Sequence, residues 1–451
     1  MDQIKNNDNN KKRVAICTLG CKVNQYESNA IMQEFIDKGY KIVEFEEKAD
    51  IYIVNTCTVT NMADKKSRQM LRRTKEINSN SILVVTGCYA QVSKEKLEKM
   101  PEIDLILGVN EKNNLIEHVE NYLNNQVNNN KDEKNKKENI KNAIVTDVMH
   151  QNEFLDFGEV TYTEKTRAVI KVQDGCNQFC SYCIIPYARG RIRSRNPENV
   201  IKEITKIAKE GIKEVVITGI HLASYGRDFE NKYLLIDLLE DIQKIEGIER
   251  IRLGSLEPTL ITEEFANRLS KLTKICDHFH LSLQSGCDET LKRMNRKYNT
   301  IQFKEGTEIL RKTFPNVHLT TDVIVGFPGE TEEEFNKTYK FLEDIKFYKM
   351  HIFKYSRRDG TLAAKMPNQI DGKVQEERSQ KLIKLSNILE EKYNEEYEGE
   401  KVEVLWEEPQ DDYITGHTKN YMFIKKKIAD VKGRENDIEE VVINKGDIVI
   451  R

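Results

Sequence analysis

The sequence predicts an α/β protein in three parts: an N-terminal parallel-sheet domain, a central partial (β/α)6 barrel and a small C-terminal all-β barrel. Short apolar runs alternate with helical patterns through the first two parts, which is the order of elements in a parallel sheet with crossover helices. The apolar runs are continuous, as expected for strands that are covered on both faces. Residues 391–451 instead combine strand periodicity with Gly turns, which predicts a small all-β module.

Three strand–helix pairs define the first predicted domain, residues 13–150. The predicted strands are 14–19, 49–56 and 81–87, and the helical patterns that follow them are 27–38, 61–76 and 93–99. Repetition of strand, turn and helix predicts that these strands lie parallel in one sheet. The Asn- and Lys-rich tracts 1–12 and 124–142 carry almost no apolar residues, so we expect a disordered tail and a low-complexity surface insertion.

Six further strands define the second predicted domain, residues 160–390. They are 167–172, 214–219, 250–255, 278–285, 319–326 and 350–356. Their spacing of about 30 to 45 residues is that of a β/α barrel, but six units are fewer than the eight of a complete barrel. We therefore expect an open or partial barrel, from which a charged helix over 375–397 leads out.

Composition excludes a membrane protein and argues against a disulfide scaffold. Of the 451 residues, 38% are hydrophobic and 32% are charged, and no stretch approaches the roughly 18 apolar residues of a spanning helix. The N-terminus lacks the apolar core of a secretory signal, and the nine cysteines are an odd number. We therefore expect a cytoplasmic protein with reduced thiols that are available for metal. The net charge of −3 decides nothing about nucleic acid.

The strongest local signal is the segment DGCNQFCSYCIIPYARG (174–190), in which Cys176, Cys180 and Cys183 follow the first barrel strand with C-x3-C-x2-C spacing. Three thiolates hold three irons of a [4Fe-4S] cluster and leave the fourth iron open to a ligand. A structural zinc site needs a fourth Cys or His at motif spacing, and the nearest histidines, His150 and His221, lie well outside the motif. An iron–sulfur cluster is therefore favoured over zinc or incidental thiols.

This segment resembles the radical S-adenosylmethionine (SAM) enzymes. The resemblance implies that the open iron binds SAM, which is cleaved reductively to a radical that abstracts hydrogen from an unactivated C–H bond. It also implies SAM contacts near TGIHL (218–222), SLQSG (282–286) and DVIVGFPGETEEEF (322–335). The residues expected there and beside the cluster are Tyr182, Thr218, Gly219, Gln284 and Asp322. Thr331 and Glu334 independently predict a capping box at a helix start.

A second group of cysteines consists of Cys21, Cys57 and Cys88, each just beyond a predicted strand of the first domain. The carboxyl ends of parallel strands share one sheet edge, so three distant thiols can converge there. The alternative is that they are buried small hydrophobes, which is the usual role of free cysteines, but polar and Gly neighbours disfavour it. Cys17 lies inside an apolar strand and is expected in the core, and Cys276 and Cys287 are expected to be structural.

Two three-cysteine sites in one chain resemble the radical SAM methylthiotransferases over nearly the whole length, including a C-terminal RNA-binding module of the TRAM type. The segments LGCKVNQYES, NTCTVTNMADKKSRQ and CNQFCSYCIIPYARG most resemble the bacterial branch that acts on N6-threonylcarbamoyladenosine in tRNA. The resemblance implies that Cys21, Cys57 and Cys88 hold an auxiliary [4Fe-4S] cluster carrying the sulfur to be transferred. It implies SAM as the second cofactor, methylthio insertion at C2 of the base, and no acid–base side chain, because the cofactors perform the chemistry.

Basic residues near both cysteine groups favour RNA as the partner. On the predicted helix after Cys57, four recur every three or four positions and form one stripe: Lys65, Arg68, Arg72 and Lys75. After Cys183, four alternate and share one side if the segment is a strand: Arg189, Arg191, Arg193 and Arg195. A single stripe is more often a solvated face, but several beside two cluster sites favour tRNA.

The expected partners are tRNA, a small iron–sulfur or flavin protein as electron donor, and a sulfur donor, with no membrane. Two alternatives stay open. One keeps the chemistry but acts on isopentenyladenosine in tRNA or on an aspartate of a ribosomal protein. The other is a non-catalytic iron–sulfur or zinc protein that only binds RNA.

Overall fold

The computed structural model describes residues 11–129, 142–163 and 166–450. The predicted tail 1–12 and insertion 124–142 lie largely outside these ranges. By internal contacts the chain divides into two units. Unit 1 comprises Met1–Tyr162, Asp174–Asn177 and Cys183–Arg195, and unit 2 comprises Thr163–Gln173, Gln178–Tyr182 and Asn196–Arg451.

Unit 1 is built on a six-stranded parallel sheet, as the sequence predicts. The strand order is β2-β1-β3-β4-β5-β6. The strands are β1 (Arg13–Thr18), β2 (Lys41–Ile42), β3 (Ile51–Thr56), β4 (Ile82–Gly87), β5 (Leu105–Leu107) and β6 (Asn142–Ile144). All residues of β3 and β4 are buried, which explains why these runs are continuously apolar. The short strands β2, β5 and β6 carry too few residues to show a pattern in the sequence.

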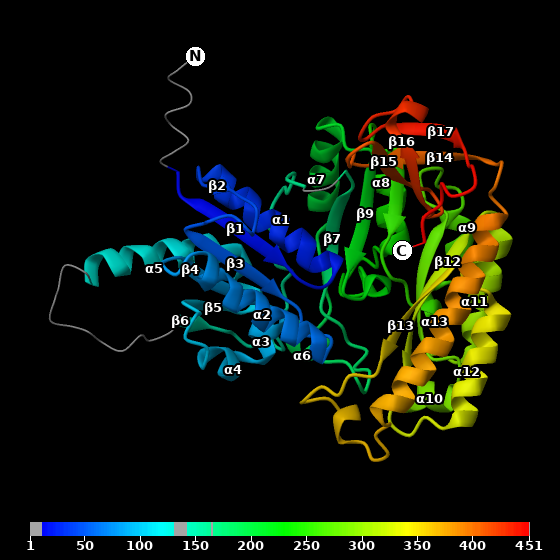
Figure 1. Ribbon diagram of the computed structural model, residues 1–451, viewed down its shortest axis with the longest axis horizontal. Helices are drawn as coiled ribbons and strands as arrows, with labels where there is room; N and C mark the ends of the chain where they lie inside the picture. Colours follow the sequence, from blue (N-terminus) through cyan, green and yellow to red (C-terminus); the bar gives the residue numbers. More distant parts are fainter. Residues whose placement is uncertain (1–10, 130–141, 164–165, 451) are drawn as a thin grey trace. The chain divides into compact units, whose positions relative to one another are not determined.

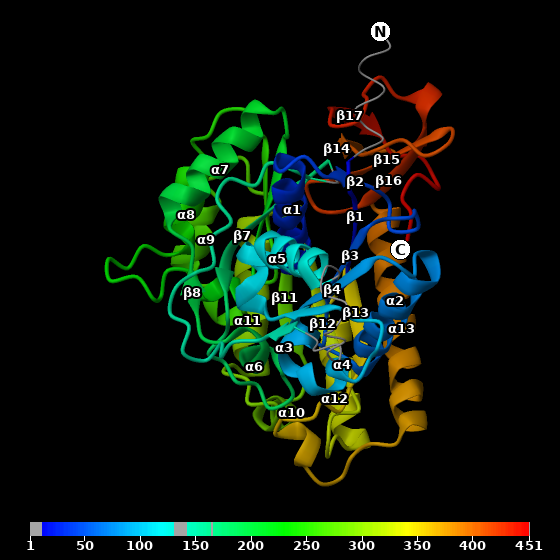
Figure 2. The ribbon, with the colours of Figure 1, turned by 90° about the vertical axis from the view of Figure 1, so that its left-hand side faces the viewer.

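Helices cover both faces of this sheet (Figure 2). On one face α1 (Lys22–Asp37), the 3-10 turn η2 (Val109–Asn114) and α5 (Leu115–Asn129) pack against alternate strand residues such as Ile53 and Val84. On the other face α2 (Asn61–Ile77), α3 (Cys88–Val92) and α4 (Lys94–Glu98) pack against the residues between them, such as Val54 and Val85. Unit 1 also contains α6 (Ile185–Arg189) and β8 (Arg193–Ser194).

Helix α1 begins five residues earlier than the sequence predicts. Cys21 is its extended N-cap residue, and the polar residues Asn24, Glu27 and Ser28 that follow are buried. The first turns bury these polar side chains together with Val23 and Tyr26, so the apolar periodicity that marks a helix in sequence is interrupted there. The predicted helix 93–99 is present as α4, and a separate short helix, α3, precedes it.

Unit 2 contains the partial barrel, and all six predicted strands are confirmed. They form two parallel sheets, β10-β9-β7 and β11-β12-β13, linked by the parallel bridges Ile251–Ile275 and Leu256–Leu281. The strands are β7 (Ala168–Asp174), β9 (Glu214–Gly219), β10 (Arg250–Leu253), β11 (His278–Gln284), β12 (His318–Val325) and β13 (Lys349–Lys354).

The barrel helices bury one continuous apolar core against these strands. They are α7 (Pro197–Lys209), α8 (Leu235–Ile242), α9 (Glu263–Leu269), α10 (Asp288–Arg293), α11 (Thr300–Thr313), α12 (Glu332–Ile345) and α13 (Gly372–Glu395). Figure 1 shows α11, α12 and α13 side by side along β11–β13. The capping box is confirmed, because the Glu334 amide donates to Thr331 Oγ1 at 3.2 Å and the Thr331 amide donates to Glu334 Oε2 at 3.1 Å. Four 3-10 turns complete the connections: η3 (Leu222–Ser224), η4 (Pro258–Leu260), η5 (Ala363–Lys365) and η6 (Ile428–Asp430).

The C-terminal module is the predicted all-β element, an antiparallel sheet in the order β16-β15-β14-β17. Its strands are β14 (Lys401–Trp406), β15 (Tyr413–Thr418), β16 (Phe423–Lys427) and β17 (Ile438–Val442). Buried Arg252 joins it to the barrel: the guanidinium pairs with Glu214 at 2.6 Å and donates to the Thr418 carbonyl at 3.1 Å. In the described part of the chain, no helix has the length and apolarity needed to cross a membrane.

We expect acid to destabilise unit 2 through His318, which is 1% exposed and stacks on Tyr348 at 4.0 Å between ring centroids. Burial lowers the pKa of His318 to about 3, whereas an unfolded histidine has a pKa of about 6.5. The unfolded chain therefore binds the extra proton between these values, and stability falls as pH drops below about 6.5. His318 alone then costs about 2 kcal/mol at pH 5 relative to pH 7.5.

Urea unfolding of the parent and of His318→Phe at pH 7.5 and pH 5 measures this effect. The variant should lose less stability on acidification by about that amount, although His417 retains its own contribution because burial lowers its pKa to about 4. His150→Gln is the control, since that side chain is 89% exposed. Equal losses in the parent and in His318→Phe would contradict the assignment.

Candidate functional site

The cysteines of unit 1 lie at the carboxyl ends of three neighbouring parallel strands. Cys21 follows β1, Cys57 directly follows β3, and Cys88 directly follows β4. The strand order β1-β3-β4 places these ends next to one another, with Thr18 paired to Asn55 and Thr56 paired to Gly87. Cys57 and Cys88 are buried. The sheet therefore brings three thiols from distant parts of the sequence to one edge.

These three thiols interact with one another. Burial raises the pKa of Cys57 to about 12, and the neighbouring Cys88 and Cys21 raise it further by adding like charge. Gly20 has φ +101°, and a Cβ there would lie 2.7 Å from the Cys57 Sγ, so only glycine permits this approach. Within the described ranges, no three His, Cys, Asp or Glu side chains are grouped closely enough to hold one metal ion. Three thiols at one edge of a sheet are nevertheless the type of ligand that an iron–sulfur cluster requires.

A buried polar scaffold supports this edge of the sheet. The Asn24 side-chain amide donates to the Leu19 carbonyl at 2.7 Å and to the Thr56 carbonyl at 3.0 Å. The Lys112 ammonium is fully buried; it pairs with Glu27 and donates to Asn55 Oδ1 at 2.9 Å. Burial lowers the pKa of Lys112. These contacts fix the chain on both sides of Cys21 and Cys57.

The C-x3-C-x2-C segment follows β7, and its three cysteines are half-buried. The Cys176 amide donates to the Gly190 carbonyl at 3.0 Å. Gly175 has φ +69°, and a Cβ there would lie 1.7 Å from the Arg191 carbonyl oxygen, so this close crossing requires glycine. The chain on either side of Cys176 is therefore folded tightly onto residues 190–191.

Cys180 belongs to a polar cluster of unit 2. The Arg296 Nη1 donates to the Cys180 Sγ at 3.3 Å, and Arg296 pairs with Glu257 at 3.5 Å. Glu257 also contacts His221 Nε2 at 2.7 Å and accepts from Gln178 Nε2 at 2.9 Å. Burial alone would raise the pKa of Glu257, but the His221 hydrogen bond and the nearby cations hold it below its usual range. The carboxylate is therefore charged and orients three side chains around Cys180.

The five residues predicted to contact SAM lie in unit 2, on or beside the barrel strands. The Tyr182 ring packs edge-on against Phe327 at 6.3 Å. Thr218 is buried near the end of β9, and a Cβ at Gly219 would lie 2.8 Å from Gln173 Oε1. The other two are on neighbouring strands: Gln284 ends β11 with φ +72°, and Asp322 on β12 lies 3.2 Å from His280 Nε2.

Comparison with known proteins identifies the family. Residues 170–342 match the Radical SAM superfamily, and residues 13–108 match a family described as Uncharacterized protein family UPF0004. The threonylcarbamoyladenosine tRNA methylthiotransferase MtaB of Bacillus subtilis (strain 168) is 41% identical over 95% of this chain and 92% of its own length. The chain belongs to the radical SAM tRNA methylthiotransferase family. The tRNA-2-methylthio-N(6)-dimethylallyladenosine synthase of Clostridium novyi (strain NT) is 35% identical over 91% of this chain and 89% of its own length.

Solved structures support the fold. The radical SAM methyltransferase TsrM from Kitasatospora setae aligns with a TM-score of 0.54 at 13% identity, covering 76% of this chain and 73% of that one. At this identity the likeness concerns the fold alone. It agrees with a parallel-sheet domain followed by a radical SAM domain.

The cofactors of this methylthiotransferase family are SAM and two [4Fe-4S] clusters. The residues present fit them, because the chain supplies two groups of three cysteines and thiolates are the ligands of such clusters. Each group also has a glycine at a close contact of the chain, Gly20 beside Cys57 in one and Gly175 beside the Arg191 carbonyl in the other.

Three of the four arginines expected to form an RNA-binding stripe are in the interior of this methylthiotransferase. Arg189, Arg193 and Arg195 are 0%, 2% and 0% exposed. They pair inside unit 1 with carboxylates, Arg189 with Glu27 at 2.5 Å and Arg195 with Asp156 at 2.8 Å. The expectation is wrong for these three because the segment is not a surface strand: β8 has only two residues and α6 precedes it. Arg191 is exposed.

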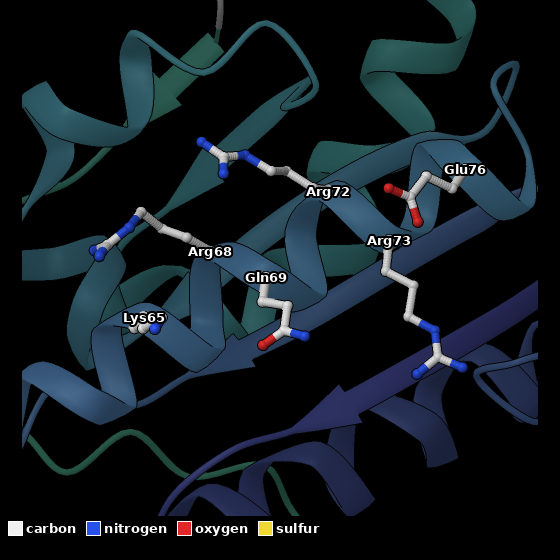
Figure 3. A pocket seen from close by; sticks show the side chains of 6 residues that line it. All are labelled: Lys65, Arg68, Gln69, Arg72, Arg73 and Glu76. Carbon is white, nitrogen blue, oxygen red and sulfur yellow. The ribbon is translucent and has the colours of Figure 1, made fainter.

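The predicted basic stripe on α2 does reach the surface. Figure 3 shows Lys65, Arg68 and Arg72 at a hollow of about 590 Å³ whose other lining residues, Gln69, Arg73 and Glu76, also come from α2. The Arg72 side chain is 64% exposed, whereas Arg68 donates to the Tyr89 hydroxyl at 2.8 Å. Lys75 is not part of the hollow, because it is tied to Asp104 at 2.9 Å.

Sequence reasoning missed the charged residues that support the cysteines, namely Glu27, Lys112, Glu257 and Arg296. Each lies far from its partners in sequence, and all but Glu27, which is part of LGCKVNQYES, lie outside the cysteine motifs. One signal was available for Glu27 and Asn24: the helix start KVNQYES carries polar residues at positions where an amphipathic helix would place apolar ones. Nothing comparable marks Arg296.

We expect Lys112→Met to destabilise unit 1 strongly, by about 3 kcal/mol or more, because it removes one partner of a buried ion pair and leaves the buried Asn55 Oδ1 without that donor. Lys38→Met is the matched control, since the Lys38–Glu120 pair is 47% and 35% exposed; such a pair contributes about 1 kcal/mol or less. Hydrogen-exchange mass spectrometry of α1 peptides measures both. Similar protection losses in the two variants would contradict a structural role for Lys112.

Proposed function

We propose that this chain inserts a methylthio group at C2 of N6-threonylcarbamoyladenosine beside the tRNA anticodon, giving 2-methylthio-N6-threonylcarbamoyladenosine. The observation that supports the proposal is the higher identity to two proteins that are named for threonylcarbamoyladenosine. The proteins named for threonylcarbamoyladenosine from Bacillus subtilis and Aquifex aeolicus (strain VF5) are 41% and 39% identical to this chain. The Clostridium novyi protein named for dimethylallyladenosine is 35% identical.

The two cysteine groups divide the work. Cys176, Cys180 and Cys183 hold the cluster that binds SAM, and Cys21, Cys57 and Cys88 hold the auxiliary cluster. When bound, SAM and its cluster supply the radical that removes hydrogen from C2. The auxiliary cluster supplies the methylated sulfur that replaces this hydrogen. The chain itself holds the thiolates in place: Arg296 donates to Cys180, and Asn24 fixes the backbone between Cys21 and Cys57.

The barrel residues provide the SAM contacts in this proposal: Tyr182, Thr218, Gly219, Gln284 and Asp322. A small iron–sulfur or flavin protein donates the electrons, a separate sulfur donor restores the transferred sulfur, and the reaction takes place in the cytoplasm. No acid–base side chain is required, because the reacting C–H bond is broken by the cofactor chemistry.

The substrate tRNA meets the exposed basic residues. Lys65, Arg68 and Arg72 on α2 follow the strand that ends at Cys57, and Arg191 lies in the segment after Cys183. Phosphate contacts position an RNA without reading its sequence. The target base itself must be unstacked for its C2 to be reached.

A nucleoside assay tests the substrate. The reconstituted protein is incubated with SAM, sulfide and a chemical reductant, and with tRNA carrying either N6-threonylcarbamoyladenosine or dimethylallyladenosine. We expect the methylthio product only from the first tRNA, detected by liquid chromatography and mass spectrometry of the hydrolysed RNA. Cys57→Ala should abolish it, whereas Cys276→Ala, a buried cysteine of unit 2, should not. Product from the dimethylallyladenosine tRNA alone would overturn the substrate assignment.

The α2 stripe makes a separate prediction about RNA affinity. Arg72→Ala should weaken tRNA binding and reduce the slope of log K against log salt concentration by about 0.7 to 0.9, the value for one lost phosphate contact. Lys38→Ala is the matched control, because Lys38 is an exposed cation of unit 1 that lies outside the hollow and is paired with Glu120 at 2.8 Å. Filter binding between low and physiological salt measures both slopes, and equal changes would refute a role specific to the stripe.

A further inference from the structure

Arg189 bonds directly to a cysteine of the N-terminal group. Its side chain is completely buried, and its Nε donates to the Cys88 Sγ at 3.3 Å. Cys88 lies about a hundred positions away in the sequence, but both residues belong to unit 1. An N–H donor from a guanidinium to sulfur is a charge-assisted hydrogen bond once the sulfur is a thiolate.

The rest of the guanidinium is fixed by other partners. Nη1 and Nη2 donate to the two oxygens of Glu27 at 2.5 and 2.9 Å, and Nη2 also donates to Asn24 Oδ1 at 2.6 Å. Nη1 lies 3.3 Å from Asp174 Oδ2. The bidentate pair with Glu27 sets the plane of the group, so the Nε is held toward Cys88 rather than free to turn away.

Buried ionic pairs surround Arg189. Three buried cations, Arg189, Lys112 and Arg193, pair with two buried carboxylates, Glu27 and Asp174. Because a guanidinium stays charged when it is buried, Arg189 places a fixed positive charge within hydrogen-bond distance of the Cys88 sulfur.

The backbone after Arg189 is locked as well. Gly190 has φ +74°, and a Cβ there would lie 2.0 Å from the Val148 carbonyl oxygen. The Arg189 carbonyl accepts from Arg193 Nη2 at 2.7 Å. The guanidinium is thus placed by both its side-chain partners and its chain, which is the pre-organisation that a support for a reactive group requires.

We propose that Arg189 is a positioning residue of the auxiliary cluster: its hydrogen bond to the Cys88 sulfur and its positive charge raise the reduction potential of the cluster held by Cys21, Cys57 and Cys88. Hydrogen bonds and positive charge at a ligand sulfur favour the reduced, more negative state of a cluster. The inference rests on the proposed function, because that function assigns the cluster to these three cysteines.

The test isolates the auxiliary cluster. In full-length protein with Cys176→Ala, Cys180→Ala and Cys183→Ala, only the auxiliary cluster remains, and its midpoint potential is measured by dithionite titration with mediators, followed by electron paramagnetic resonance. We expect Arg189→Gln to lower the midpoint potential by about 59 mV for a one-electron couple. This shift corresponds to a change of about tenfold in the ratio of reduced to oxidised cluster. Arg189→Lys keeps the charge and should give a smaller shift in the same direction, which keeps the test valid if the Gln variant does not fold.

Arg195→Lys is the matched control. Arg195 is as buried as Arg189 and also lies in unit 1, but its partners are Asp156, Gly158 and Tyr26 rather than a sulfur. Its potential should equal that of the parent. A cluster with an unchanged potential in Arg189→Lys, or an equal shift in Arg195→Lys, overturns the role of Arg189 alone. Failure of the parent triple variant to bind about four irons per chain overturns the two-cluster function and this inference with it.

Discussion

The structure of unit 1 depends on the pairing of buried charges beneath the cysteine-bearing end of its sheet. Glu27 lies between Lys112 and Arg189, and all three are at most 1% exposed. Removing such groups from water costs several kcal/mol for each ion, so the arrangement persists only while every partner is in place. The same bonds reach the thiols, because Lys112 also holds Asn55 and Arg189 also holds Cys88. Apolar packing stabilises the sheet, whereas buried ion pairs hold the residues around its cysteine-bearing end in place.

In unit 2 a cysteine is also supported by an arginine that is paired with a glutamate, but the residues are different. Arg296 donates to the Cys180 sulfur from within the barrel, and Glu257 ties that arginine to His221 and Gln178. In both units an arginine anchored by a glutamate presents an N–H to a cysteine at 3.3 Å. Arginine suits this task because it stays charged when buried and offers donors in a rigid plane. A lysine can match the charge but not the planar geometry.

Most strands of both units, and the two groups of cysteines beyond them, could be located from the sequence because buried strands leave a clear pattern of apolar residues. Continuous Val and Ile runs such as 51–54 and 82–85 are buried on both faces, and six barrel strands could be located from the same pattern. Contacts across long separations left no such signal. The alternation Arg189, Arg191, Arg193 and Arg195 suggested a surface strand, but a short helix and the Gly190 turn carry the first side chain into the interior. Burial of a charge depends on a partner such as Glu27, which is 162 positions away.

The arginines of this chain therefore fall into two groups, buried and exposed, although the net charge of the protein is only −3. Buried arginines have fixed partners, which include the Cys88 sulfur for Arg189 and the Thr418 carbonyl for Arg252. Exposed arginines, such as Arg72, keep their side chains in water. There each contact with a phosphate is weaker than a buried ion pair, but the attraction extends over about 8 Å at physiological salt. Salt should therefore weaken the RNA-facing contacts while leaving the buried ones nearly unaffected, because screening requires access to ions. Position relative to water, rather than residue type, decides which task each arginine performs.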